Sequence, residues 1–579
     1  MPNIGDAGND GVDGATNIGN SLTNQLTISG TIYKTGGATD YEAKSGNTIL
    51  LTGVSPTITT GGADLSFSTG NLVLSSAGTT KFTTGSGSAG GITVAGTIDG
   101  TNGQNEALAL ESGSGAIQLQ GTIGGTNPVT TLAINSTNGS AGTIEIVGIG
   151  DSDTTGASST ATIGNTSTGT LTLDGTIYKT GGNQTYVASA TGNDSGQNID
   201  ITGAATFTTT NDAVAFNTSG VDLANNGTTT INTGTGIGDV SFAGALESNG
   251  GSNDLLVITS GAGDVTFTGA VGATNALGGL DVNSSAGDGD ITFSSTIGDS
   301  GNAGVVGTTA IGGTATEDVN LAGLIYKFDG GTTITAADGD NIKLTGTGDV
   351  TFTTAADNIE FATGHIHLAD GSNLVVDTGA LLGNITIAEI AGTSQETVTL
   401  DAGTGTTSVG PIGSGTEIGD LSIGSDANGG ITLNGAIVTD GTVLIDGPVT
   451  LATGAVSVTT ANDTITFNHT INGTQTLTLE SGSAAIKLDG AIGGTGILTG
   501  LSVNATDGST GTIEISDIGD ADDAAGVNTG TISIGNANTA TLTLDGTVYK
   551  TDGATIYESA AGDKILLTGA DVTISTLND

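Results

Sequence analysis

The chain has 579 residues, of which 102 are glycine and 58 are acidic but only nine are basic, so its formal net charge is −49. All nine basic residues are scattered lysines, which excludes the clustered positive charge that DNA or RNA binding requires. The chain has no cysteine, which excludes disulfides and thiolate sites, and no apolar run approaches the roughly 20 residues that span a bilayer.

A short alternating pattern recurs along the chain and predicts half-buried β-strands. In residues 117–123, IQLQGTI, apolar and polar residues alternate before a glycine. Alternation at period two places the apolar side chains on one face of a strand. Copies within each series start roughly 21 to 29 residues apart, a spacing typical of solenoid repeats. The copies start at Ile92, Ile117, Ile144, Leu171, Ile199, Val240, Val265, Ile291, Val319, Ile342, Ile465, Ile486, Ile513, Leu542 and Ile565.

The pattern predicts an all-β fold in which residues 1–579 form one continuous parallel β-helix, or β-solenoid. One coil of about 25 residues cannot bury its own apolar face, whereas stacked coils bury aliphatic columns and pair each strand above and below. A string of β-sandwich domains is the alternative, because its strands would look alike locally. We favour the solenoid because the repeat is too short for a sandwich.

A longer repeat is superposed on the coils. Residues 112–127, SGSGAIQLQGTIGGTN, return as SGSAAIKLDGAIGGTG at 481–496. The approximate long units are 1–60, 93–182, 240–331 and 463–553. Residues 4–53 align with 518–569, so both ends fall in the same type of unit. We expect a segment of a longer protein; the alternative is that the ends dock head to tail into a filament.

Tyrosine and lysine occur together at four equivalent positions of the long repeat, and a further tyrosine follows eight residues later in three copies, at Tyr41, Tyr186 and Tyr557. This spacing predicts a strand-turn-strand pair whose rings meet on the outer face. Exposed tyrosine and lysine can stack on a sugar or a neighbouring molecule, although an aromatic clamp that tightens one coil is the alternative. The candidate partner contacts are Tyr33, Lys34, Tyr178, Lys179, Tyr326, Lys327, Tyr549 and Lys550.

Acidic clusters in glycine-rich connections are candidate metal ligands. Oxygen ligands at alternate positions of a flexible loop suit Ca²⁺. No complete EF-hand loop or calcium-binding nonapeptide repeat is present, and solvated charge that keeps a β-protein soluble is the alternative. No cofactor is required by the sequence, and calcium is the one these clusters could bind. The candidate ligands are Asp6, Asp10, Asp13, Asp151, Asp153, Asp520, Asp522 and Asp523.

Catalysis is not expected. Polysaccharide lyases and hydrolases on β-helices need convergent carboxylates, usually with arginine or lysine, in a groove formed by long loops. Here no arginine is available and the connections look short and alike. The sequence contains no carboxylate constellation that is unique to one place.

The coil repeat, the acidic composition rich in glycine, threonine and asparagine, and the lack of cysteine together resemble large repetitive β-strand surface proteins of bacteria. These include filamentous-haemagglutinin-like adhesins and surface-layer or matrix fibre proteins. The resemblance implies a right-handed parallel β-helix, export to the cell surface, and attachment or fibre building. The chain lacks the amino-terminal secretion domain of the haemagglutinin-like group, which leaves the export route open.

The sequence therefore predicts a non-catalytic structural or adhesive protein of a bacterial cell surface. It would act in an extracellular filament, fibre or layer, through head-to-tail or lateral self-association or through contact with surface glycans. Nucleic acid and a membrane span are not expected. The alternatives are a polysaccharide-binding or polysaccharide-degrading β-helix protein and a calcium-dependent matrix protein.

Overall fold

The computed structural model describes residues 1–579 except 86–88, 102–104, 138, 192–196, 250–252, 286, 394, 425–428, 507, 521–525, 529 and 577–579. The described chain is an all-β parallel β-solenoid of about 22 coils with about 24 residues per coil, and it contains no helix. The predicted fold class is confirmed, and the finer boundaries of the long units stay predictions.

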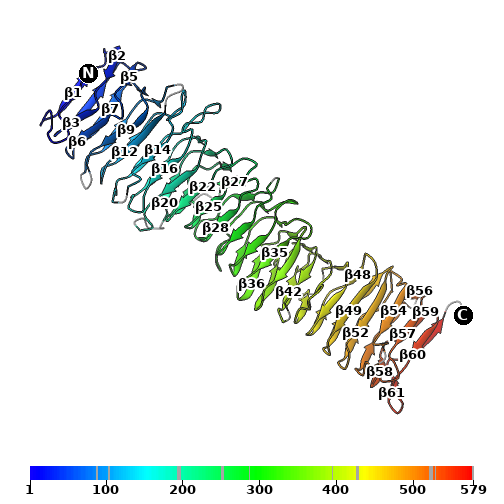
Figure 1. The fold of residues 1–579 in the computed structure, drawn as a ribbon. Coiled ribbons are helices and arrows are strands. Elements are labelled where there is room, and N and C mark those ends of the chain that lie inside the picture. Colours follow the sequence, from blue (N-terminus) through cyan, green and yellow to red (C-terminus); the bar gives the residue numbers. More distant parts are fainter. Residues whose placement is uncertain are drawn as a thin grey trace. The chain divides into compact units, whose positions relative to one another are not determined.

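The chain divides into two compact units. Unit 1 comprises Met1–Gly298, Gly304–Val306 and Ile311–Thr316, and unit 2 comprises Asp299–Ala303, Gly307–Ala310 and Glu317–Asp579. In each unit short parallel strands of successive coils lie side by side (Figure 1).

One coil of unit 1 shows how the sequence pattern becomes structure. Strands β22 (Val214–Asn217), β23 (Gly220–Leu223) and β24 (Thr228–Asn232) form three sides of a coil. The next coil repeats them as β25 (Val240–Phe242), β26 (Leu246–Ser248) and β27 (Leu255–Thr259), each parallel to its predecessor. In β25 the side chains alternate between buried and half-buried, as period two requires.

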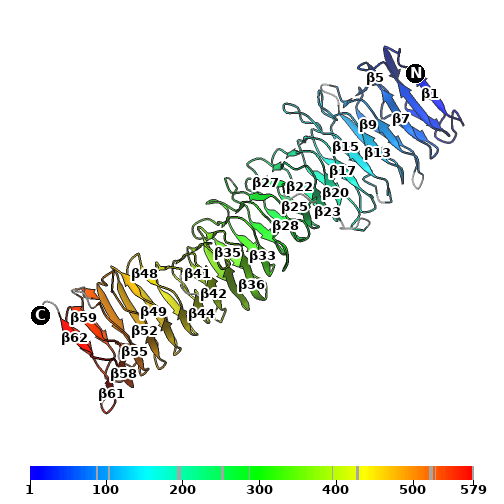
Figure 2. The same ribbon diagram turned by 180° about the vertical axis from the view of Figure 1, so that it is seen from behind.

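A ten-stranded parallel sheet forms one side of unit 1, and part of it is seen in Figure 2. Aliphatic residues of its strands pair in register, for example Ile117 with Ile144 and Ile144 with Leu171. These columns are the predicted apolar ladder. In spatial order the strands are β1 (Thr16–Gly19), β4 (Thr39–Glu42), β7 (Leu65–Thr69), β10 (Ile92–Val94), β13 (Ile117–Leu119), β15 (Ile144–Ile146), β17 (Leu171–Leu173), β20 (Gln197–Ile201), β23 and β26.

Aromatic rings also stack in a column inside unit 1. On β19 (Gln184–Val187), β22, β25, β28 (Val265–Phe267) and β30 (Ile291–Phe293), five buried rings follow one another with centroids 4.6 to 5.2 Å apart. The rings are Tyr186, Phe216, Phe242, Phe267 and Phe293. The parallel register sets this spacing, because adjacent strands lie about 4.8 Å apart.

Unit 2 is built in the same way. Its strands β47 (Val443–Ile445), β48 (Val449–Leu451) and β49 (Val456–Thr460) are followed by β50 (Ile465–Phe467), β51 (Ile471–Gly473) and β52 (Thr476–Glu480), again in parallel pairs. An eleven-stranded sheet forms one side. Its strands are β33 (Ile325–Lys327), β36 (Gly348–Thr353), β39 (Ser372–Asp377), β42 (Val398–Asp401), β44 (Leu421–Ile423), β47, β50, β53 (Ile486–Leu488), β55 (Ile513–Ile515), β58 (Thr541–Leu544) and β61 (Lys564–Leu567).

A corner before each Tyr-Lys pair changes which residues face inward. Leu171, Leu173 and Gly175 are buried, as period two predicts, but the next buried residue is Tyr178 and not Ile177. A β-carbon on Gly175 would lie 1.9 Å from the carbonyl oxygen of Val147 in the preceding coil, so the backbones approach too closely here for any other residue. The tight corner shifts the alternation by one position.

Candidate functional site

The structure places the four tyrosines of the Tyr-Lys pairs inside the solenoid. Tyr33, Tyr178, Tyr326 and Tyr549 expose at most 1% of their surface. The prediction that these rings meet on the outer face is therefore wrong, because the corner turns the tyrosine inward. The Tyr178 and Tyr186 rings do meet, edge to face with centroids 6.3 Å apart, but in the core.

Each tyrosine hydroxyl braces its corner. The Tyr178 hydroxyl accepts a hydrogen bond from the backbone N–H of Gly175 and donates one to the carbonyl oxygen of Ile146 in the preceding coil, both at 2.9 Å. Gly323 and Gly546 donate in the same way to Tyr326 and Tyr549 at 2.9 Å. Burial raises the pKa of the Tyr178 hydroxyl far above its usual range, so the hydroxyl keeps the proton that it donates.

Three of the four lysines of the Tyr-Lys pairs, Lys34, Lys179 and Lys327, reach outward to a loop of the preceding coil. Lys34 Nζ lies 3.4 Å from Asp10 Oδ1. Lys179 Nζ donates to the carbonyl oxygen of Ser152 at 2.9 Å, and Lys327 Nζ to that of Ser300 at 3.3 Å. The structure thus joins Lys34 to the candidate metal ligand Asp10, and joins Lys179 and Lys327 to serine carbonyl oxygens of the coil before them. Whether these lysines also contact a partner stays a prediction.

The first aspartate of each described loop holds its own turn. Asp6 Oδ1 accepts the backbone N–H groups of Gly8 and Asn9, both at 2.8 Å. Asp151 Oδ1 accepts those of Asp153 and Thr154 at 2.8 and 2.6 Å. These backbone hydrogen bonds lower the pKa of both carboxyl groups. Asp299, which the sequence analysis did not single out, holds an equivalent turn in unit 2.

The structure does not gather the predicted calcium ligands into a metal cluster. Among the described residues, no three aspartate, glutamate, histidine or cysteine side chains are placed to hold a metal ion. Asp522 and Asp523 lie outside the described residues. Asp6 and Asp151 are engaged with backbone N–H groups and Asp10 with a lysine, while calcium binding at these loops stays a prediction.

Buried asparagine–serine pairs are a repeated feature that sequence reasoning missed. Asn135 Oδ1 accepts the Ser112 N–H at 2.8 Å, and Asn135 Nδ2 donates to Ser112 Oγ at 3.1 Å. Asn135 has φ of 43°, in the left-handed region that asparagine tolerates better than most residues. The same pair returns as Ser260–Asn283 and Ser481–Asn504. The recurrence of serine and asparagine at matching positions of the long repeat was the signal in the sequence that could have revealed these pairs.

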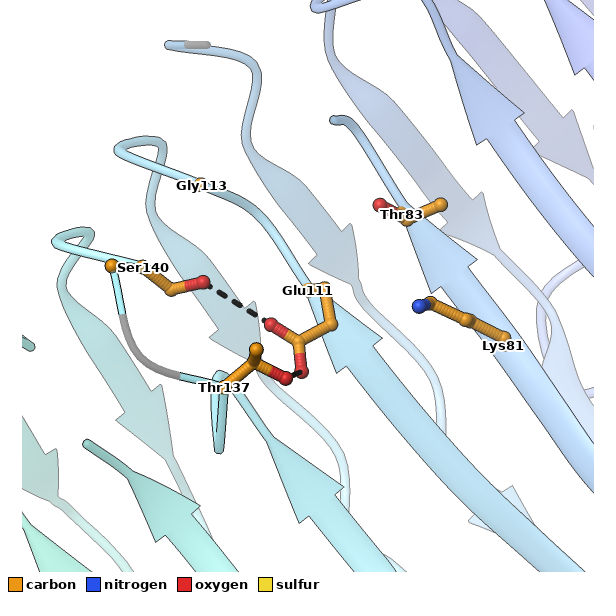
Figure 3. A pocket seen from close by; sticks show the side chains of 7 residues that line it. Lys81, Thr83, Glu111, Gly113, Thr137 and Ser140 are labelled. Carbon is orange, nitrogen blue, oxygen red and sulfur yellow. Dashed lines mark hydrogen bonds between the residues drawn. The ribbon is translucent and has the colours of Figure 1, made fainter. Parts of the chain in front are cut away.

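A polar hollow of about 270 Å³ lies on the outside of unit 1, next to β9 (Gly78–Thr83) and β12 (Glu106–Glu111) (Figure 3). The Glu111 carboxylate accepts hydrogen bonds from the Thr137 and Ser140 hydroxyls at 2.7 and 3.1 Å. The Lys81 ammonium has no partner among the described residues. The hollow is lined by Lys81, Thr83, Glu111, Gly113, Thr137, Gly139 and Ser140.

Unit 2 repeats the carboxylate of this hollow without its lysine. Glu480 accepts the Thr506 and Ser509 hydroxyls at 2.8 and 3.1 Å. Strand register pairs Thr83 with Glu111 and Thr459 with Glu480, so Ser457 stands where unit 1 has Lys81. The combination of a free ammonium and a braced carboxylate therefore distinguishes the hollow of unit 1 from its copy.

Three carboxylates stand on neighbouring strands of the ten-stranded sheet. Asp222 on β23 pairs in register with Asp200 on β20 and Glu247 on β26. Burial, followed by the charges of Asp200 and Glu247, raises the pKa of Asp222 from 3.8 to about 6. Its charged form is therefore disfavoured in the folded protein, and the resulting instability is fully present above pH 6 and disappears below pH 3.8.

We expect Asp222→Asn to stabilise the protein at pH 7 and to have no such effect at pH 3.5. Because Asp222 is only half-buried, solvent screening reduces the gain to about 1 kcal/mol. Urea unfolding of the wild-type and variant proteins at each pH measures this gain. Comparing the two proteins at the same pH cancels the general effect of pH on the charge of the chain. Asp153→Asn, which changes an exposed aspartate, should leave stability unchanged. A destabilised Asp222→Asn protein at pH 7 would contradict this account.

Fold and contacts together define the chain as a repeat protein of the parallel β-solenoid class. No family model, curated protein or solved structure matches it. In the described part of the chain, no helix is long and apolar enough to cross a membrane.

Proposed function

We propose that the protein is a non-catalytic structural or adhesive component of a bacterial cell surface, acting in an extracellular filament, fibre or layer. One observation carries the proposal: the polar residues that recur in the long repeat connect one coil to the next. The Tyr178 hydroxyl and the Lys179 ammonium both bond to carbonyl oxygens of the preceding coil. Repeated hydrogen bonds of this kind suit a mechanical role, because they hold each coil to the one before it.

Self-association is the expected behaviour. The acidic exterior keeps copies of the chain apart by charge repulsion unless cations bridge their carboxylates, so cations would support association. Negative-stain microscopy of the full chain with calcium and with EDTA tests this. Fibres in both conditions would support the filament proposal, and fibres with calcium alone would favour the calcium-dependent matrix protein. Separate single particles in every condition would contradict a filament role.

Glycan binding is the second candidate, and the hollow at Glu111 favours it. Its hydroxyls, braced carboxylate and free ammonium offer donors and acceptors suited to a hydroxyl-rich ligand. Binding to a glycan array that disappears in Lys81→Ala would support this candidate. Ser457→Ala, at the equivalent position without lysine, is the matched control and should leave binding unchanged. Turnover of any polysaccharide would contradict the non-catalytic proposal.

A further inference from the structure

Two acidic side chains are buried at the ends of one connection in unit 1. Asp99 ends β11 (Ile98–Asp99) and Glu106 begins β12, and their exposed fractions are 8% and 0%. A carboxylate removed from water needs hydrogen-bond donors or a cation, because burial disfavours an unpaired charge. Each of the four carboxylate oxygens therefore calls for a partner.

Both oxygens of Asp99 have donors. Oδ1 accepts the backbone N–H groups of Thr126 and Asn127 in the next coil at 2.8 and 3.3 Å. Oδ2 accepts the Thr97 hydroxyl at 3.2 Å. Asp99 is therefore held in place as a buried acceptor, with its charge directed toward the following coil.

Glu106 is only half satisfied. Its Oε1 accepts the Thr101 hydroxyl. Its Oε2 is buried and has no hydrogen-bond partner among the described residues. A buried polar atom without a partner is rare in folded proteins and points to a bound water or ion.

A second oxygen without a donor among the described residues lies near Glu106 Oε2. A β-carbon on Gly100 would lie 2.4 Å from the carbonyl oxygen of Pro128 and 3.4 Å from Glu106 Oε2. The Pro128 oxygen accepts no hydrogen bond from a described residue. Both oxygens thus lie close to the Gly100 backbone, where a side chain would collide with the Pro128 carbonyl oxygen.

We propose that Ca²⁺ binds between Glu106 Oε2 and the Pro128 carbonyl oxygen, with Asp99 adding a second buried negative charge in the same connection. Carboxylate and backbone carbonyl oxygens are the ligands that Ca²⁺ prefers, and its flexible coordination tolerates an irregular set of ligands better than the octahedral geometry of Mg²⁺. The site is separate from the acidic loops singled out in the sequence, and the inference does not depend on the proposed function.

Unit 1 contains a matched carboxylate that needs no cation. Asp254 precedes β27 as Glu106 begins β12, and it is 2% exposed. Its Oδ1 accepts the backbone N–H groups of Asn225 and Asn226 at 3.1 and 2.7 Å, and its Oδ2 accepts the Ser248 hydroxyl. Because both oxygens of Asp254 have donors, we expect no calcium site at this position.

Calorimetric titration of the metal-free full chain with calcium chloride tests the proposal. In potassium chloride at physiological ionic strength, we expect one saturable Ca²⁺ site that Glu106→Gln weakens by about 100-fold or more, a loss at least as large as that from changing an outer-shell partner of a metal. Asp254→Asn should keep the site. Magnesium chloride should not saturate it at the same concentrations.

A second measurement keeps the test decisive if Glu106→Gln folds poorly. Calcium should raise the thermal unfolding midpoint of the wild-type chain and of Asp254→Asn, because a ligand that binds only the folded state stabilises it. No saturable site and no calcium-dependent shift in the wild-type chain would overturn the proposal. Full calcium binding by a folded Glu106→Gln chain, or equal affinity for magnesium, would overturn it as well.

Discussion

Phe242→Ala is expected to destabilise unit 1 by about 4 kcal/mol, the largest effect of a single substitution that we predict. The Phe242 ring is 1% exposed and lies between the rings of Phe216 and Phe267, with centroids 5.0 and 5.1 Å apart. Truncation leaves a cavity and also removes two aromatic contacts, each contributing about 1 kcal/mol. Few other positions in the described core combine both losses.

The effect should be local, because each coil of a solenoid contacts only its neighbours. Hydrogen exchange should accelerate most in β22, β25 and β28, and guanidinium unfolding of unit 1 should begin at lower denaturant. Ile237→Ala is the matched control, since Ile237 is 79% exposed and its truncation should change stability by less than about 0.5 kcal/mol. Uniform acceleration across both units would contradict a nearest-neighbour solenoid.

The strands and their stacking could be predicted from the sequence because a solenoid repeats a local pattern. Ile117, Ile144 and Leu171 each start a copy of the alternating motif, and the structure pairs these residues in register. When every coil buries the same face of its strands, the alternation at period two and the coil-length repeat together specify which residues stack. No long-range information beyond the repeat is required.

The corners could not be predicted in this way, and the errors at the site follow from them. Extending the alternation through Gly175 places Ile177 inside and Tyr178 outside, whereas the backbone turn reverses both. A glycine three residues before each tyrosine, at Gly30, Gly175, Gly323 and Gly546, was the signal that the hydroxyl has a fixed backbone donor.

Glu106 shows a second limit of sequence reasoning. In the sequence Glu106 looks like the many exposed acidic residues. Only the structure shows that one of its carboxylate oxygens is buried without a hydrogen-bond donor. Asp254 has the same charge at an equivalent corner but is satisfied by two backbone N–H groups and a hydroxyl. The difference arises from the neighbouring coil, which a local pattern does not describe.

Tyr178→Phe is expected to lower the free energy of unfolding by about 2 kcal/mol, which is the second large effect that we predict. The substitution keeps the ring and its stacking on Phe207, with centroids 4.9 Å apart, but removes the hydroxyl. The Gly175 N–H then loses its hydrogen-bond acceptor, whereas the Ile146 carbonyl oxygen still accepts the Asp174 N–H at 3.0 Å. Leaving the buried Gly175 N–H unsatisfied costs about 1 to 3 kcal/mol. Guanidinium unfolding and hydrogen exchange at Gly175 measure the loss.

The chain supplies a control with the opposite expectation. The Tyr41 hydroxyl is buried but has no hydrogen-bond partner among the described residues. Tyr41→Phe removes a polar group that gains nothing from burial, so it should leave stability unchanged or raise it by up to about 1 kcal/mol. If Tyr178→Phe and Tyr41→Phe destabilise the protein equally, the tyrosine hydroxyls are not corner braces. The recurrence of the Tyr-Lys pairs would then need a reason outside the solenoid, such as contact with a partner.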